Sequence, residues 1–304
     1  MKSSLRIAQV APLAESIPPQ KHGGAERVVS YLTEALVEAG HEVTLFASGD
    51  STTAATLVPG CDRALRRAGC EGVADSAQMA MLERVYRRAD EFDLIHTHLD
   101  YLAFPFARRH PTPTVTTLHG RLNIPMLERL YAEYGDLPVI SISHAQRSPL
   151  GNAPRWLANI YQGMPRELLS FEGGEGDYLA FLGRMSPNKG VDAAIRVAIE
   201  ADVPLKIAAK VAEVDREYFH TELEPMLGHP NVEFVGEIAE SDKQQFLGNA
   251  AALLFMIDWP EPFGLVMIEA MACGTPVIAR RRGSVPEVVD DGLTGFVCED
   301  EQQA

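Results

Sequence analysis

The stretch WPEPFGLVMIEAMACGTP (residues 259–276) combines two glutamates with an almost continuous apolar run. Glu261 and Glu269 lie eight positions apart. At a helical rise of about 1.5 Å per residue, their backbones are separated by roughly 12 Å along the axis. This distance is about the reach of a ligand that has a polar ring at each end and a diphosphate between them.

The apolar residues between the glutamates predict a buried helix from about Phe263 to Cys273. Pro262 suits the first helical position, and Gly274 suits the end of the helix. A carboxylate inside such a helix is costly unless a partner neutralises or binds it. Glu269 is therefore either one half of a structural ion pair with an arginine or lysine, or the acceptor for the two hydroxyl groups of a ribose.

The segment EPFGLVMIEAMACGTPV (residues 261–277) resembles the E-x7-E signature of the retaining glycosyltransferases of family 4, and the similarity extends over essentially the whole chain. The resemblance implies an α/β protein of the GT-B fold, in which two Rossmann-like domains face a cleft. In that family the residue matching Glu269 holds the ribose hydroxyls, and the one matching Glu261 holds a hydroxyl of the transferred sugar. The helix N-terminus around Gly264 and Leu265 helps to stabilise the leaving diphosphate.

Length and composition indicate a globular protein of two domains. The chain has 304 residues, of which 46% are apolar and 23% charged, and no run approaches the roughly 18 apolar residues of a transmembrane helix. A net charge of −15 argues against a nucleic-acid partner. The N-terminal run, which Arg6 and Gln9 interrupt, predicts a first strand and not a signal peptide. The four cysteines form no C-x-x-C pair, which favours a reducing, cytoplasmic location.

A βαβ unit opens the chain, with a strand at Leu5–Ala11, a helix that ends at Gly40 and a strand at Glu42–Ala47. Gly23 and Gly24 stand before the helix, where backbone N–H groups can face a phosphate, although a glycine pair more often makes a tight turn. The resemblance implies that this loop borders the donor diphosphate and the transferred sugar.

Residues 51–75 show no periodicity, and residues 76–89 form an amphipathic helix whose arginines indicate a solvated face or a weak membrane-surface contact. Ligands of parallel sheets bind at the carboxyl ends of the strands. The alternation of short apolar runs with helices predicts such a sheet, with strands at Asp93–His98, Thr112–Leu118, Val139–Ser143 and Trp156–Tyr161.

Polar residues end several of these strands, among them His98 and His119. His96, His98 and Asp100 also fit a metal site, but no helical H-E-x-x-H segment or cysteine cluster accompanies them, and a polar ligand cleft explains the same residues. We therefore expect no metal. In the resembled family, the histidine at the position of His119 contacts the transferred sugar.

The glycine-rich, acidic segment at residues 165–176 predicts a linker, and we place the domains at residues 1–168 and 169–304. The second domain begins with a strand at Tyr178–Arg184 and a helix at Val191–Ala201. Further strands are expected at Leu205–Lys210, Val232–Gly236, Ala252–Ile257, Pro276–Arg280 and Gly295–Glu299.

Two cations flank the first turn of the second domain, with Arg184 at the end of a strand and Lys189 before a helix. On their own they would suit a salt bridge and a surface lysine. The pattern G-R-x4-K-G, however, resembles the one that opens the second domain of the family, where the two cations stabilise the diphosphate. The family also places the nucleotide base near the turn that ends at Ile238.

The resemblance implies a metal-independent enzyme without a cofactor, which moves a sugar with retention from a UDP- or GDP-linked donor to a sugar, lipid or small-molecule acceptor. The first domain is expected on the acceptor side and the second on the donor side. Two alternatives remain, a nucleotide-sugar epimerase of the same fold and a non-catalytic binding module. Relatives continue through further helices, so we expect either a truncated sequence or a domain that closes without them.

Overall fold

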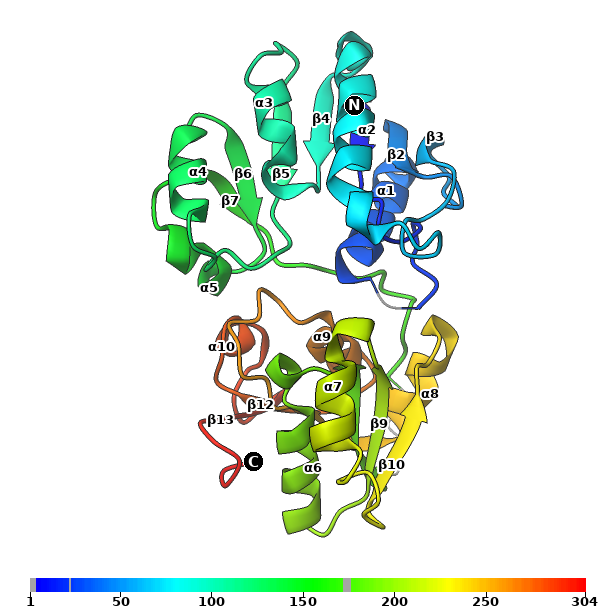
Figure 1. The fold of residues 1–304 in the computed structure, drawn as a ribbon, viewed down its shortest axis with the longest axis vertical. Helices are drawn as coiled ribbons and strands as arrows, with labels where there is room; N and C mark the ends of the chain where they lie inside the picture. Colours follow the sequence, from blue (N-terminus) through cyan, green and yellow to red (C-terminus); the bar gives the residue numbers. More distant parts are fainter. Residues whose placement is uncertain (1–3, 22, 172–175) are drawn as a thin grey trace. The chain divides into compact units, whose positions relative to one another are not determined.

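A computed structural model describes residues 4–21, 23–171 and 176–304, and the chain divides into two compact units, Met1–Met164 and Pro165–Ala304 (Figure 1). Each unit contains one parallel sheet with helices packed against it, which confirms the prediction of two Rossmann-like domains. Four residues of the predicted glycine-rich linker, 172–175, lie outside the described residues. Within the described ranges, no helix is long and apolar enough to cross a membrane.

The first unit has a seven-stranded sheet in the order β3-β2-β1-β4-β5-β6-β7. The order reverses between β1 and β4, and ligands of open α/β sheets bind at such a switch point. The strands are β1 (Arg6–Val10), β2 (Glu42–Ser48), β3 (Thr56–Cys61), β4 (Leu94–Thr97), β5 (Thr114–Thr117), β6 (Pro138–Ser141) and β7 (Arg155–Asn159). The edge strand β3 lies within residues 51–75, where the sequence showed no periodicity.

Helices cover both faces of this sheet, because successive residues of a strand point to opposite sides. Phe46 of β2 packs with residues of α2 (Ala74–Arg87) and α3 (Phe104–Ala107). Its neighbour Leu45 packs on the other side with Val29 of α1 (Gly24–Glu38). Two shorter helices, α4 (Leu127–Glu133) and α5 (His144–Arg147), complete the unit.

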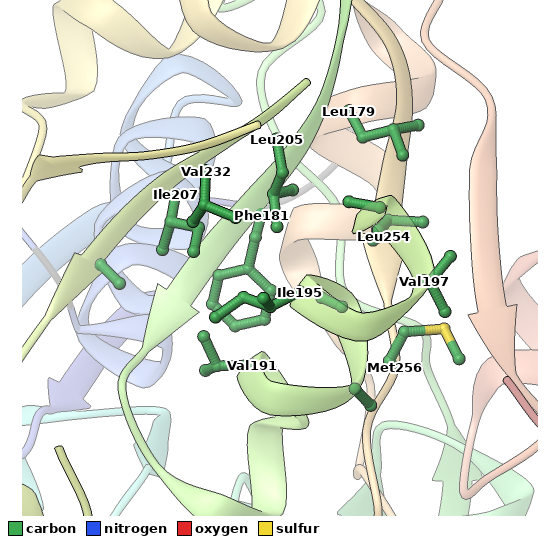
Figure 2. Packing of buried hydrophobic residues seen from close by; sticks show 14 of the residues in the cluster. Leu179, Phe181, Val191, Ile195, Val197, Leu205, Ile207, Val232, Leu254 and Met256 are labelled. Carbon is green, nitrogen blue, oxygen red and sulfur yellow. The ribbon is translucent and has the colours of Figure 1, made fainter. Parts of the chain in front are cut away.

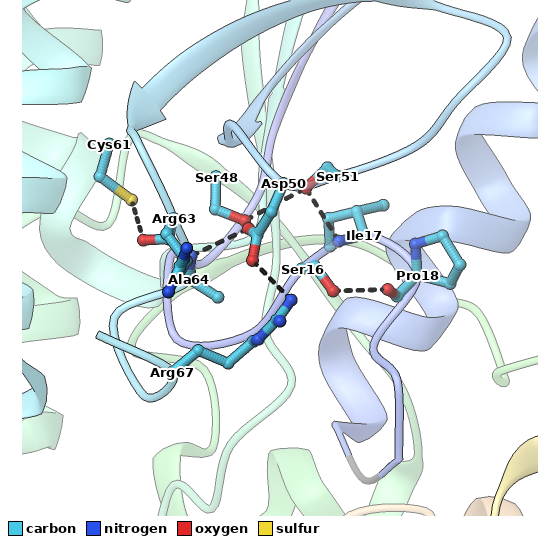
Figure 3. A network of polar contacts seen from close by, with 10 residues as sticks. All are labelled: Ser16, Ile17, Pro18, Ser48, Asp50, Ser51, Cys61, Arg63, Ala64 and Arg67. Carbon is cyan, nitrogen blue, oxygen red and sulfur yellow. Dashed lines mark hydrogen bonds and ion pairs between the residues drawn. The ribbon is translucent and has the colours of Figure 1, made fainter. Parts of the chain in front are cut away.

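Polar contacts join the loops that follow β1, β2 and β3 (Figure 3). The Asp50 carboxylate accepts the Ala64 backbone N–H over 2.9 Å and contacts the Arg67 guanidinium at 3.1 Å. The Ser51 hydroxyl accepts the backbone N–H of Ile17 over 2.9 Å. These contacts fix the loop that leads from β1 into α1.

The second unit has a six-stranded sheet in the order β10-β9-β8-β11-β12-β13, with its switch point between β8 and β11. Phe181 of β8, Ile207 of β9 and Ile195 of α6 belong to the main core cluster (Figure 2). The strands are β8 (Tyr178–Arg184), β9 (Leu205–Lys210), β10 (Val232–Gly236), β11 (Ala250–Phe255), β12 (Val277–Arg280) and β13 (Gly295–Cys298). The helices are α6 (Val191–Glu200), α7 (Arg216–Tyr218), α8 (Lys243–Gly248), α9 (Leu265–Ala272) and α10 (Val285–Val288).

The helix between the two glutamates, α9, starts later than the sequence predicts. It begins at Leu265 and not at Phe263, because Gly264 adopts a left-handed conformation with φ 83° at the N-cap. Pro262 therefore precedes the helix and does not open it. The predicted stop is confirmed, since Gly274 has φ 88° immediately after the C-cap residue.

The prediction that α9 is buried on nearly every side is wrong. Met267, Glu269 and Ala270 are buried, whereas the other five residues of the helix are partly exposed. One carboxylate nevertheless lies on the buried side, and it needs a partner there.

Candidate functional site

Each glutamate of the E-x7-E segment meets a lysine. Lys189 Nζ lies 2.5 Å from Glu261 Oε2, and Lys243 Nζ lies 2.7 Å from Glu269 Oε1. Both glutamates are buried, with exposed fractions of 9% for Glu261 and 4% for Glu269. The second oxygen of each carboxylate has no hydrogen-bond partner among the described residues. Each glutamate can therefore still accept a hydrogen bond from a ligand.

The backbone around Glu261 is fixed on both sides. Its N–H donates to the Trp259 carbonyl over 2.9 Å, and its carbonyl accepts the Ser284 N–H over 3.0 Å. Gly283 packs so closely that a Cβ there would lie 2.3 Å from the Glu261 nitrogen. This position therefore requires glycine, and the contact holds Glu261 between β11 and α9.

Lys189 reaches Glu261 because the turn after β8 packs against the chain that leaves β11. Lys189 ends a short 3-10 turn, Pro187–Lys189, and Gly190 follows with φ 68°. A Cβ on Gly190 would lie 1.8 Å from the Met256 carbonyl oxygen, so only glycine permits this approach. The ion pair thus lies beside the β8/β11 switch point of the second sheet.

Lys243 is a site residue that the sequence did not reveal. It lies in α8, is buried, and contacts Glu240 at 3.1 Å as well as Glu269. Of the two readings of Glu269, the ion pair is therefore present in this structure. The second carboxylate oxygen of Glu269 could still accept a ribose hydroxyl group, as the other interpretation requires.

Among the described residues, two other predicted donor residues of the second unit, Arg184 and Ile238, form no hydrogen bond or ion pair with either lysine–glutamate pair. Arg184 is half-exposed and contacts Asp215 at 3.0 Å. Ile238 lines a groove of about 540 Å³ together with Tyr178, Lys206 and Phe246. Neither lysine–glutamate pair lines this groove.

Gly264 and Leu265 form the N-terminus of α9, three to four positions after Glu261. Among the described residues, no side-chain hydrogen bond caps this end of the helix. Its first backbone N–H groups carry the positive end of the helix dipole, so the end suits an anion.

Hydrogen bonds connect three histidines and two glutamines in the first unit. His98 Nε2 lies 2.8 Å from Gln9 Oε1, and His98 Nδ1 lies 2.9 Å from His119 Nε2. His119 Nδ1 lies 3.1 Å from the Gln162 amide nitrogen. His96 hydrogen-bonds with Gln9 at 3.4 Å and with the Thr117 hydroxyl at 2.8 Å.

One assignment of protons satisfies the contacts of His98 and His119 with neutral rings. His98 donates from Nε2 to Gln9 and accepts the Nε2–H of His119, whose Nδ1 accepts the Gln162 amide. Gln162 was not predicted as a site residue, and it occupies the nitrogen of His119 that His98 leaves open. A ligand that donates a hydrogen bond to Nδ1 of this ring must compete with Gln162.

Burial sets the protonation of this cluster. It lowers the pKa of His119 to about 3 and that of His96 to about 4, and it lowers the pKa of His98 well below its ordinary value. Burial also raises the pKa of Asp100 to about 6. Because the ring nitrogens of His96 and His98 are engaged in hydrogen bonds, they do not point to a shared metal, and the described residues contain no group of three potential ligands suited to one.

Gly23 and Gly24 lie at the N-terminus of α1, as predicted, with Gly23 at the N-cap and φ 144°. A Cβ on Gly23 would lie 3.2 Å from the carboxylate oxygen Oε2 of Glu26. Glu26 is buried, and burial raises its pKa. The N-terminus of α1, which the sequence suggests as a phosphate site, therefore already has the Glu26 carboxyl group beside it.

Two family models match the chain, one in each unit. The model described as Glycosyltransferase Family 4 matches residues 22–162, and the one described as Glycosyl transferases group 1 matches residues 170–304. An uncharacterized glycosyltransferase of Methanocaldococcus jannaschii is 27% identical over 226 residues, which are 69% of this chain and 62% of that protein. The chain thus matches less than two thirds of this relative's length.

Solved structures share the fold of this chain. AviGT4, a glycosyltransferase involved in avilamycin A biosynthesis, has a TM-score of 0.72 and 25% identity, covering 97% of this chain and 84% of its own. HepE of Anabaena in complex with UDP-glucose has a TM-score of 0.75 and 19% identity, covering 98% of this chain and 87% of its own. The likeness to HepE concerns the fold alone.

Proposed function

Since this chain belongs to glycosyltransferase family 4 and has the GT-B fold, we propose that it transfers a sugar from a nucleoside diphosphate sugar to an acceptor. The observation that carries the proposal is the state of Glu261 and Glu269. Each is held through one oxygen by a lysine, and within the described ranges its other oxygen has no partner. Carboxylate oxygens accept hydroxyl groups, and a sugar nucleotide offers hydroxyls on both its ribose and its sugar.

The second unit binds the donor in this proposal. Glu269 accepts the ribose hydroxyls, and Glu261 accepts a hydroxyl of the transferred sugar. Lys189 and Arg184 stabilise the diphosphate as it leaves, together with the uncapped N-terminus at Gly264 and Leu265. Positive charges at the leaving group lower the barrier without a metal ion, because they stabilise the negative charge that develops there. Ile238 marks the place of the base.

The first unit contributes to the sugar and the acceptor. The neutral ring of His119 can exchange its hydrogen bond with Gln162 for one with a sugar hydroxyl. Gly23 and Gly24 border the sugar in this scheme, because the Glu26 carboxyl already lies beside the helix end that would otherwise face a phosphate. The acceptor is a sugar, a lipid or a small molecule.

We infer transfer with retention, because none of the described residues assigned to the site supplies a base on the sugar face opposite the leaving group. Inversion requires a general base on the sugar face opposite the leaving group. Glu261 lies next to the α9 N-terminus, on the diphosphate side, and His119 holds the sugar in this scheme. The acceptor oxygen then attacks from the face that the diphosphate leaves, a leaving phosphate oxygen takes its proton, and an α-linked donor gives an α-linked product.

The test is a thermal-shift screen with UDP- and GDP-linked sugars, since a ligand that binds the folded state raises its stability. The sugars that bind are then incubated with acceptors, and NMR coupling constants define the product. We expect an α-linked product, and a β-linked one would contradict retention. Free nucleotide with an altered sugar and no acceptor would indicate an epimerase. Binding without turnover over a broad acceptor panel would indicate a binding module.

A further inference from the structure

Trp259 contacts both partners of the Lys189–Glu261 pair. Its indole Nε1–H donates to Glu261 Oε2 over 2.7 Å, and Lys189 Nζ lies 5.0 Å from the centroid of its ring. Lys189 donates to the same oxygen, Oε2. The three side chains therefore form a closed triangle in which one carboxylate oxygen is shared by an indole and an ammonium group.

The two donors on Oε2 respond differently to an anion. The lysine ammonium is a full charge on a flexible stem, so a diphosphate can draw it away from the carboxylate. The indole is neutral, donates through one N–H only, and turns about two side-chain bonds. Its backbone is also held, because the Trp259 carbonyl accepts the Glu261 N–H and the preceding Asp258 N–H donates to the Asn188 carbonyl at 3.1 Å.

We propose that Trp259 is a positioning residue, which keeps Glu261 in place when Lys189 moves from the carboxylate to the donor diphosphate. This inference rests on the proposed function, because it requires a nucleoside diphosphate sugar in the site. The retained indole bond on Oε2 fixes the direction of the other oxygen, Oε1, which then accepts the sugar hydroxyl. Trp259 performs this positioning through its indole N–H group, and the size of its ring is not required.

The first test observes the indole bond directly and requires no turnover. The chain has two tryptophans, and Trp156 lies in β7 of the first unit, where its indole donates to the Gly151 carbonyl. In W156F labelled with 15N-tryptophan, one indole signal reports Trp259. We expect its indole proton to exchange slowly with water. The exchange should stay slow when UDP or GDP is added, and also when the K189M substitution is introduced into the labelled protein. E261A should accelerate the exchange at least tenfold.

The second test separates positioning from binding. W259F keeps an aromatic ring for Lys189 but removes the N–H donor. We expect kcat to fall on the order of 10- to 100-fold, because a hydrogen bond to a charged group is worth about 1.5–3 kcal/mol. The dissociation constant for UDP or GDP should stay within about twofold, because the indole does not contact the phosphates in this scheme. W156F is the matched control and should retain the wild-type kcat.

The outcomes distinguish this inference from the function on which it rests. If the chain binds no nucleoside diphosphate, both are overturned. If it turns over a donor but W259F matches W156F in kcat, only the role of Trp259 is overturned. Indole exchange that accelerates when the nucleotide binds would also overturn it, and this measurement holds even if W259F folds poorly, because it uses the native Trp259.

Discussion

Lowering the pH from about 7 to about 5 should destabilise the first unit, because desolvation keeps its clustered histidines neutral. The folded-state pKa is about 3 for His119 and about 4 for His96, against an ordinary value of 6.5. The unfolded chain therefore takes up these protons below about pH 6.5, whereas the folded unit does not. Their contribution to stability is complete above that pH and is lost as the pH falls toward the folded-state pKa values.

The magnitude follows from linkage. The shifted pKa values of His96 and His119 each lower the free energy of unfolding by about 2 kcal/mol between pH 7 and pH 5. Asp100 acts in the opposite direction, because its pKa is raised to about 6 and the folded state takes up its proton first. This offsets about 1 kcal/mol and leaves a net loss of about 2 to 3 kcal/mol. The lowered pKa of His98 adds to this loss, and the raised pKa of Glu26 reduces it.

Urea unfolding followed by tryptophan fluorescence measures this effect in the first unit, if W259F is used so that Trp156 alone reports. H96N removes one titrating ring and should reduce the pH-dependent loss by about 2 kcal/mol. H220N is the control, since His220 is exposed in the second unit. A free energy of unfolding that is equal at pH 7 and pH 5, or an unchanged loss in H96N, would refute the reasoning.

Three further predictions concern the second unit. K243M should destabilise it by about 3 to 5 kcal/mol in urea unfolding, because Glu269 would be left as a buried charge without its cation. K206M is the control: it removes a cation near the Tyr178 ring and should lower the free energy of unfolding by less than about 1 kcal/mol. E269A should weaken the binding of free UDP or GDP in calorimetry, whereas E261A should leave it nearly intact and reduce turnover; an equal loss of affinity in both would contradict their roles. EDTA should not change the affinity for either nucleotide, and a strict magnesium requirement would contradict the metal-free donor site.

The strands were largely predictable because a parallel sheet covered on both faces leaves short, almost continuous apolar runs in the sequence. The bounds of β8, β9 and β10 agree with the prediction to the residue. The missed strand, β3, is an edge strand whose side chains are partly exposed and which contains Pro59 and Gly60. Proline and glycine are tolerated at an edge, but they erase the pattern by which a strand is identified.

The partners of the site residues could not be predicted, because they depend on how distant elements pack. Glu269 stands out in the sequence as a carboxylate among apolar residues, but its partner Lys243 lies in an ordinary polar segment of α8, which packs against α9. Trp259 was within the quoted stretch, yet its indole bond depends on the turn that places Glu261 two positions later. The late start of α9 has a local cause, since Gly264 could either continue a helix or begin one.

In the proposed function, the lysine–glutamate pairs explain how an acidic chain could receive an anionic donor. With a net charge of −15, two bare carboxylates at the site would repel a diphosphate. Lys189 and Lys243 cancel that charge while the site is without ligand. When a diphosphate binds, Lys189 can leave the Glu261 carboxylate and pair with the phosphates, so that its positive charge is paired before and after binding. Glu261 then gains a sugar hydroxyl as the ammonium leaves, and the exchange links the binding of the phosphates to the orientation of the sugar.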